Sequence, residues 1–215
     1  IKNPLTPIQL TIDKLKNKYL QEINIHEKAQ FDKSLKIIGK QIKQIENLVN
    51  EFSDFARMPK PILKDNNLVL IIKENINLIN ELDTNILINF NYDNDKIMLN
   101  SDNEQLSRVF FNLIKNSIES IQEKNKKDVN LKGKIDITLS DKASNIDFII
   151  TDNGLGFKKF AENIKNILNP YFTTKEKGTG LGLSIVNKII NDHNGSINFK
   201  STENGAKVEI DFIKQ

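Results

Sequence analysis

Apolar residues recur at alternating intervals of three and four along the first part of the chain. The two sets are Ile1, Leu5, Ile8, Ile12, Leu15 and Tyr19, and Leu35, Ile38, Ile42, Ile45, Val49 and Phe52. Each set forms a heptad seam on one helix face, so the pattern predicts a helical hairpin over residues 1 to about 57, with its turn at residues 24–28. Two such helices bury little core alone, so we expect two copies to form a four-helix bundle. Packing against the rest of the chain is the alternative.

Pro59 and Pro61 end the second helix and mark the expected boundary between domains at residues 1–60 and 61–215. Beyond it, helical and strand patterns are mixed. Helices are expected over residues 68–82, 102–122, 157–168 and 181–190, with Asp102 as the cap of the second. Strands are expected at residues 86–92, 97–99, 135–139, 146–152, 196–201 and 206–212, and the third and fourth should form a hairpin.

Composition narrows the possible chemistry. The 215 residues are enough for one large or two small domains, and 38% hydrophobic with 27% charged residues is typical of a globular protein. A net charge of +3 is too slight to indicate nucleic-acid binding. The absence of Cys excludes disulfides, thiolate metal sites and Cys nucleophiles, and only two His argue against a His-rich metal site. Because the chain starts at Ile1 without Met, we expect it to be a fragment.

Two glycine clusters frame the most informative stretch. They are Asp152-Asn153-Gly154-Leu155-Gly156 and Gly178-Thr179-Gly180-Leu181-Gly182-Leu183. Asp152 ends an apolar strand, and a carboxylate placed there can accept a hydrogen bond from a ligand that the glycines allow close to the backbone. The second cluster leads into an apolar helix, whose first backbone amides suit a phosphate. For either cluster taken alone, the alternative is that its glycines only form turns and bind no ligand.

A polar face follows the helix expected over residues 102–122. Asn112, Lys115, Asn116 and Glu119 lie three or four residues apart and therefore share one side, while Leu106, Val109, Leu113 and Ile118 supply apolar contacts. Taken alone, such a face is usually only solvated.

Four sequence boxes together resemble the ATP-binding domain of sensor histidine kinases, within the gyrase, Hsp90, kinase and MutL superfamily. They are Asn112-Leu113-Ile114-Lys115-Asn116-Ser117, Asp-x-Gly-x-Gly at 152–156, Asn-Pro-Tyr-Phe-Thr-Thr-Lys at 169–175, and Gly-Thr-Gly-Leu-Gly-Leu at 178–183. The fold class expected from this resemblance is α+β. It comprises a dimerising hairpin and a Bergerat-type α/β sandwich, with helices on one face of a mixed sheet.

The resemblance implies roles for these residues. ATP would lie between the Asn116 helix and a lid at residues 169–180, with Asn116 giving its amide oxygen to Mg²⁺ and Lys115 facing phosphate. Asn112 stands where the superfamily's ATP hydrolases carry a Glu general base, and an amide cannot accept a proton in that role. The remaining expected nucleotide contacts are Asp152, Gly154, Gly156, Thr173, Thr174, Lys175, Gly178, Thr179, Gly180, Leu181, Gly182 and Leu183.

The opening residues 1–8, Ile-Lys-Asn-Pro-Leu-Thr-Pro-Ile, resemble the segment that follows the phosphoacceptor in histidine kinases. On that match the acceptor His and a neighbouring Glu precede Ile1, and Asn3 takes the position linked to dephosphorylation of the partner. His26, in the expected turn, and His193, a capping or surface residue at a helix end, do not match the acceptor. Residues 49–61 resemble NtrY-type nitrogen-regulation sensor kinases. That resemblance implies a homodimer, an NtrX-like response-regulator partner, and the cytoplasmic portion of a sensor anchored in the bacterial inner membrane.

The predicted function is ATP-dependent transfer of a phosphoryl group to a His and then to a response-regulator Asp. An ATP-hydrolysing clamp of the same superfamily is one alternative, and Asn112 argues against it. A non-catalytic dimerising scaffold is another. The intact glycine boxes argue against that scaffold, but Ala206, where the family often has a Thr touching the adenine site, leaves nucleotide affinity open.

Overall fold

The computed structural model describes residues 5–19, 25–80, 86–157, 164–173 and 178–214. The chain divides into two compact units, Ile1–Met58 with Thr173–Thr179, and Pro59–Phe172 with Gly180–Gln215. Each unit is described by itself. Within the described residues, no helix has both the length and the apolar character needed to cross a membrane.

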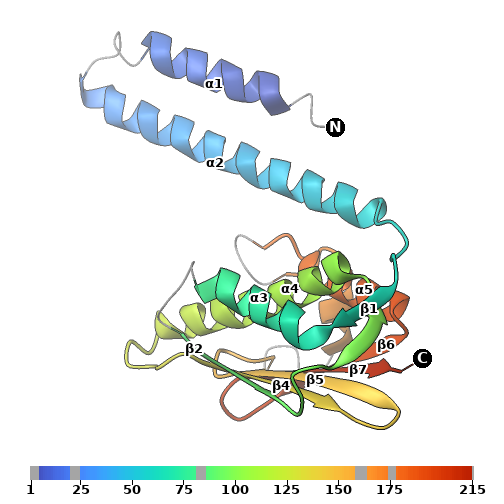
Figure 1. The fold of residues 1–215 in the computed structure, drawn as a ribbon. Helices are drawn as coiled ribbons and strands as arrows, with labels where there is room; N and C mark the ends of the chain where they lie inside the picture. Colours follow the sequence, from blue (N-terminus) through green and yellow to red (C-terminus); the bar gives the residue numbers. More distant parts are fainter. Residues whose placement is uncertain (1–4, 20–24, 81–85, 158–163, 174–177, 215) are drawn as a thin grey trace. The chain divides into compact units, whose positions relative to one another are not determined.

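The first unit contains the expected helical hairpin, made of α1 (Leu5–Tyr19) and α2 (Ile25–Ala56) (Figure 1). Lys16 of α1 lies 3.9 Å from the carboxylate of Asp32 on α2. Because α2 already begins at Ile25, residues 25–28 are helical, and the prediction of a turn there is wrong. Glu27 lies in the first turn of α2, where a negative charge favours the start of a helix.

A mixed five-stranded sheet organises the second unit. Its order is β2 (Leu87–Tyr92), β4 (Lys134–Asp141), β5 (Asn145–Asp152), β7 (Ala206–Ile213) and β6 (Gly195–Ser201). β2 runs parallel to β4, and the other neighbours are antiparallel. The hairpin of β4 and β5 is present as predicted, with Ile135 opposite Asp152.

Three helices cover one face of this sheet, namely α3 (Leu68–Asn80), α4 (Asn103–Asn125) and α5 (Gly182–Asp192) (Figure 1). Alternate strand residues face them and form the core, including Ile135, Ile137, Leu139, Ile146, Phe148, Ile150, Ile210 and Phe212. The rings of Phe110 on α4 and Phe148 on β5 lie 4.9 Å apart between centroids. This arrangement is the α/β sandwich that the family resemblance implies, and the period-two alternation of the strands places their apolar residues on the covered face.

One pairing was not predicted. β1 (Lys64–Asn67) pairs antiparallel with β3 (Met98–Ser101) in a separate two-stranded sheet. Four polar residues make up β1, so it lacks the apolar alternation that marks a strand. Its asparagines hold the pairing instead, because the Asn66 amide donates to the Ser101 carbonyl at 2.7 Å and the Asn67 side chain accepts from the Ile97 amide at 3.2 Å.

The helix expected over residues 157–168 is only partly visible. Ile164–Leu168 form a short 3-10 helix, η2, and residues 158–163 lie outside the described part of the chain.

Candidate functional site

Asp152 is a buried carboxylate at the end of β5. It lies in phase with Ile146, Phe148 and Ile150, so its side chain faces the helices and is only 8% exposed. Its Oδ1 accepts from the Gly154 amide at 2.9 Å and, at a longer 3.4 Å, from the Ala206 amide. The Ser117 hydroxyl of α4 also donates to the carboxylate.

The environment of Asp152 has two opposing effects on its ionisation. Burial raises the pKa of the carboxyl above its ordinary value, because the charged form loses hydration. The hydrogen bonds from Gly154, Ser117 and Ala206 and the positive charge of Lys124 favour the charged form and partly offset this rise. An ionised carboxylate has about four acceptor positions, so three protein donors leave room for about one donor from a ligand.

The glycines after Asp152 are required by close packing. A Cβ on Gly154 would lie 2.4 Å from the Ser120 hydroxyl oxygen of α4. Gly156 has φ +69°, and a Cβ there would lie 2.4 Å from the Gly205 carbonyl oxygen. The Leu155 amide donates to the Ser120 hydroxyl at 2.9 Å, which fastens the loop to α4. Close approach of a ligand to this backbone stays a prediction.

The polar face of α4 is turned away from the core as expected. Leu106, Val109, Leu113 and Ile118 are buried, while Asn112, Asn116 and Glu119 are half-buried and Lys115 is exposed. The helix begins after Asp102, whose side chain accepts from the Gln105 amide at 3.0 Å. The Lys115 ammonium lies 4.0 Å from the Glu119 carboxylate. The side chains to which the family resemblance gives phosphate and metal roles therefore lie on one side of one helix.

The second glycine cluster meets α4 at Asn112. α5 begins at Gly182, and Leu181 at its N-cap makes no side-chain capping bond. A Cβ on Gly182 would lie 4.0 Å from Asn112 Oδ1, so the start of α5 lies beside the polar face. Gly180 has φ +71°, and a Cβ there would lie 2.4 Å from the Tyr171 carbonyl carbon. Asp152 contacts α4 at Ser117, and Gly182 lies beside α4 at Asn112. These two positions on α4 are five residues apart, which is roughly 7 Å along the helix.

Six predicted site residues are not among the described residues of the second unit. Asn3, Thr174 and Lys175 lie outside the described residues. Thr173, Gly178 and Thr179 belong to the first unit, and Thr173 is exposed. The second unit contains the remaining predicted residues, namely Asn112, Lys115, Asn116, Asp152, Gly154, Gly156, Gly180, Leu181, Gly182 and Leu183.

Several residues that shape the site were not found from the sequence. Ser117 and Ser120 support the Asp152 loop from α4, and small hydroxyl residues within an apolar helix stripe could have indicated them. Asn153 accepts from the Lys134 amide and donates to the Lys132 carbonyl, both at 2.8 Å. Lys124 donates to two backbone carbonyls near Asp152. Neither Asn153 nor Lys124 carries a local sequence signal for these contacts.

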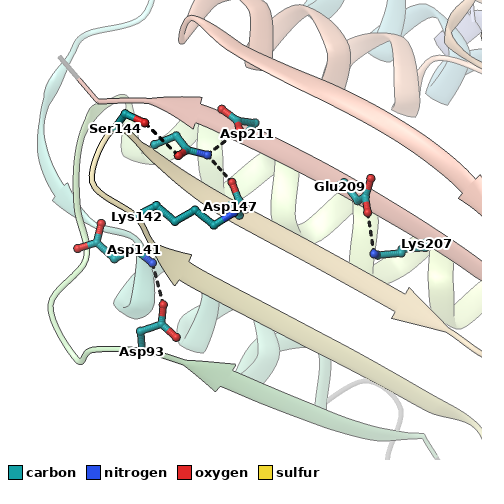
Figure 2. A network of polar contacts seen from close by, with 9 residues as sticks. Asp93, Asp141, Lys142, Ser144, Asp147, Lys207, Glu209 and Asp211 are labelled. Atoms are coloured by element: carbon teal, nitrogen blue, oxygen red, sulfur yellow. Dashed lines mark hydrogen bonds and ion pairs between the residues drawn. The ribbon is translucent and has the colours of Figure 1, made fainter.

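The opposite face of the sheet carries ion-paired and hydrogen-bonded side chains (Figure 2). Asn145 donates to Asp147 at 2.6 Å and to Asp211 at 2.7 Å. Lys200 and Lys207, each 2.6 Å from Glu209, lower the pKa of that carboxyl to about 2. A hollow of about 300 Å³ lies on this face, but none of the predicted nucleotide residues lines it. The face is therefore a solvated surface remote from the Asp152 chemistry.

Comparison with known families matches both parts of the chain. Residues 1–61 match the His Kinase A (phospho-acceptor) domain, and residues 101–215 match the histidine kinase-, DNA gyrase B- and HSP90-like ATPase family. An NtrY-like sensor histidine kinase of Rickettsia prowazekii is 38% identical over 99% of this chain, and the nitrogen regulation protein NtrY of Azorhizobium caulinodans is 35% identical over 95%. The chain spans only 34% and 26% of the lengths of these two relatives.

Solved structures agree with these matches. The catalytic domain of histidine kinase ThkA superposes with a TM-score of 0.62 and 32% identity, over 71% of this chain and 95% of that one. ThkA in complex with the response regulator TrrA covers all of this chain and 58% of that one, with a TM-score of 0.68 and 25% identity. The chain therefore belongs to the histidine kinase-, DNA gyrase B- and HSP90-like ATPase family, and it joins that domain to the phospho-acceptor domain of a sensor histidine kinase.

Proposed function

We propose that the second unit binds Mg-ATP and that its γ-phosphoryl group passes to a His of the phospho-acceptor domain and then to an Asp of a response regulator. The observation that carries this proposal is the Asp152 carboxylate, buried and held by three donors beside the polar face of α4. The family match supports ATP use. The activity of the longer protein is part of the proposal, because the chain covers about a third of its relatives.

The base would be recognised at Asp152. With room for about one more donor, the carboxylate suits the exocyclic amine of adenine. A keto oxygen in the place of the amine could not donate to the Asp152 carboxylate, because both groups are acceptors. The buried carboxylate would then lack one hydrogen-bond partner, which costs binding free energy. The Ala206 amide already donates to Asp152, so a side-chain hydroxyl at that position is not needed to hold the carboxylate.

The phosphates would lie toward Gly182 and Asn112. The start of α5 offers backbone amides and the positive end of a helix dipole, and Lys115 adds a cation one turn along α4 from Asn112. The separation of roughly 7 Å along α4 between the two ends of the site is comparable with the length of a nucleoside. Asn112 cannot remove a proton from water, which supports phosphoryl transfer over hydrolysis.

Asn116 would supply the protein oxygen for Mg²⁺. No group of three or more His, Cys, Asp and Glu side chains among the described residues could hold a metal ion. The half-buried amide of Asn116 on the polar face fits an ion that takes few protein ligands and completes its shell with phosphate oxygens and waters. When bound, the ion would neutralise phosphate charge, while Lys115 and the start of α5 orient the phosphates.

The hairpin would form a homodimer. Ile8, Ile38, Ile45 and Phe52 are each more than 40% exposed, at 46%, 46%, 48% and 42%, which leaves much of the predicted seams uncovered. ThkA has been solved with a response regulator, and by analogy we propose an NtrX-like receiver domain as partner of this chain. We further propose that Asn3 serves dephosphorylation of that partner and that the longer protein is membrane-anchored.

Calorimetric titration with a non-hydrolysable ATP analogue, with and without Mg²⁺, tests the proposal. The unaltered chain should bind with Mg²⁺, and Asp152→Ala should abolish binding. Asp147→Ala is the matched control, because Asp147 lies five residues earlier on the same strand but on the opposite face. No binding by the unaltered chain would favour the scaffold, and steady phosphate release from ATP without an acceptor would favour the hydrolysing clamp.

A further inference from the structure

Lys124 joins two loops that meet at the Asp152 carboxylate. It lies in the last turn of α4, and its ammonium donates to the Asn153 carbonyl at 2.8 Å and to the Asn204 carbonyl at 2.6 Å. Asn153 belongs to the loop after β5, and Asn204 belongs to the turn between β6 and β7. Both hydrogen bonds are charge-assisted, which makes them stronger than bonds between neutral groups.

The two loops touch through their backbones. A Cβ on Gly205 would lie 2.0 Å from the Asp152 carbonyl oxygen, and one on Gly156 would lie 2.4 Å from the Gly205 carbonyl oxygen. Thr202 stabilises the turn, because its hydroxyl accepts from the Gly205 amide at 2.9 Å. No side chain separates the loops at these points, so their spacing is set by the β5–β7 pairing, which reaches Thr151 and Lys207, and by the two bonds to Lys124 beyond it.

That spacing determines where the carboxylate lies. Of the two amides that donate to Asp152 Oδ1, Gly154 belongs to the first loop and Ala206 follows the second. The Ala206 bond is already long at 3.4 Å, so a small separation of the loops would break it. The Asp152 carboxylate would then lose one of the donors that orient it.

We propose that Lys124 is a positioning residue for recognition of the nucleotide base. It ties the Asn153 and Asn204 carbonyls together and so fixes the remaining acceptor position of Asp152 for an exocyclic amine. This inference rests on the proposed nucleotide function of Asp152. If Lys124 has this role, the last turn of α4 contributes to the preference for adenine, although it lies beyond the sequence box that carries Asn112 and Asn116.

Displacement of a fluorescent ATP analogue by ATP and by inosine triphosphate tests the role. Inosine triphosphate has a keto oxygen in place of the adenine amine and otherwise the same phosphates. Lys124→Met, which keeps most of the aliphatic stem and removes the ammonium, should weaken ATP binding by about tenfold, as expected when the adenine amine loses its hydrogen bond to the charged Asp152 carboxylate. Inosine triphosphate binding should change much less, so the preference for ATP should fall.

Two further variants separate positioning from general stability. Lys124→Arg keeps the charge and the donors and should restore most of the ATP preference. Lys127→Met removes an exposed lysine one turn further on and should leave both affinities within about twofold. An equal loss for both nucleotides in Lys124→Met, or an equal effect in Lys127→Met, would overturn the inference.

Amide hydrogen exchange without nucleotide distinguishes failure of this inference from failure of the proposed function. In Lys124→Met the Ala206 amide should exchange faster than in Lys127→Met, because it donates to Asp152 across the two loops, whereas the Gly154 amide donates within its own loop and should change less. Unchanged exchange would refute the link between the loops even if ATP binds. If the unaltered chain binds no nucleotide, the proposed function and the role in base recognition both fall, and exchange still decides whether Lys124 holds the loops.

Discussion

The His193 imidazole accepts a hydrogen bond from the Asp102 backbone amide at 2.9 Å and thereby joins the C-cap of α5 to the N-cap of α4. Its other nitrogen, Nδ1, lies 2.8 Å from the Ile189 carbonyl, which can only accept. The hydrogen-bond network therefore assigns a neutral ring protonated at Nδ1. His193 is only 5% exposed, so of the two alternatives drawn from the sequence, a surface position is wrong.

Replacing His193 should loosen the contact between the two helices that carry the site. His193→Phe keeps a ring but removes both side-chain hydrogen bonds and leaves the Asp102 amide without its acceptor. We expect the free energy of unfolding to fall by about 1–3 kcal/mol. Urea denaturation checks this value, and an unchanged midpoint would show that water or another acceptor satisfies the amide.

Asp152→Asn should change the pH dependence of the unfolding free energy and should also remove ATP binding. Because burial raises the pKa of Asp152 in the folded state above 3.8, the folded chain holds this proton more tightly than the unfolded chain does. The stability linked to the proton is therefore fully present below 3.8 and is lost as pH rises through the folded pKa. Asn carries no charge, so the variant should gain stability relative to the unaltered chain as pH rises to neutrality, and should lose ATP binding.

Urea denaturation at acidic and neutral pH, with nucleotide titration at neutral pH, measures both effects. A constant difference in unfolding free energy across this pH range would contradict the assigned direction of the Asp152 pKa shift.

Gly154→Ala should disturb the Asp152 loop although the substitution adds one methyl group. The new Cβ would lie 2.4 Å from the Ser120 hydroxyl oxygen and 2.8 Å from its carbonyl carbon, and the helix backbone cannot move aside easily. We expect a loss of about 1–3 kcal/mol in unfolding free energy and weaker nucleotide binding.

The control for this prediction is Gly39→Ala in α2, where a Cβ would meet nothing within 4 Å. Alanine is the better helix former, so the control should raise helix stability by about 0.5–1 kcal/mol. Equal behaviour of the two variants in thermal unfolding would mean that the loop moves to accept the methyl group.

Asn116→Ala should weaken Mg²⁺-dependent nucleotide binding by about tenfold or more while the fold stays intact, because an amide oxygen is lost from a half-buried position on α4. Asn91→Ala, at an exposed strand position, is the control. Titration of the ATP analogue at several Mg²⁺ concentrations measures the effect. The same Mg²⁺ dependence in both variants would remove Asn116 from the metal site.

The same substitution can be tested on transfer itself. With the family's His and Glu placed before Ile1, the chain should take up acid-labile phosphate from ATP, and Asn116→Ala should suppress that uptake. Unimpaired labelling would contradict the assignment.

Features that depend on local periodicity could be predicted from the sequence. Spacings of three and four gave the hairpin seams, alternation placed the strands, and the phase of β5 put Asp152 on the side of its buried residues. The polar positions of α4 share a face because 3.6 residues make a helical turn. These patterns, with the glycine boxes, were enough to identify the ATP-binding fold, and the nucleotide-binding roles of the individual residues stay predictions.

Contacts between residues far apart in the chain could not be predicted from the sequence and became visible only in the folded structure. β1 pairs with β3 through backbone and asparagine contacts, His193 accepts from Asp102 across 91 residues, and Lys124 reaches carbonyls of Asn153 and Asn204. Every residue carries a backbone carbonyl, so no residue type marks the one that a distant lysine will contact. Local periodicity therefore predicted most of the helices and strands, whereas the packing of loops against α4 decided how the Asp152 carboxylate is held.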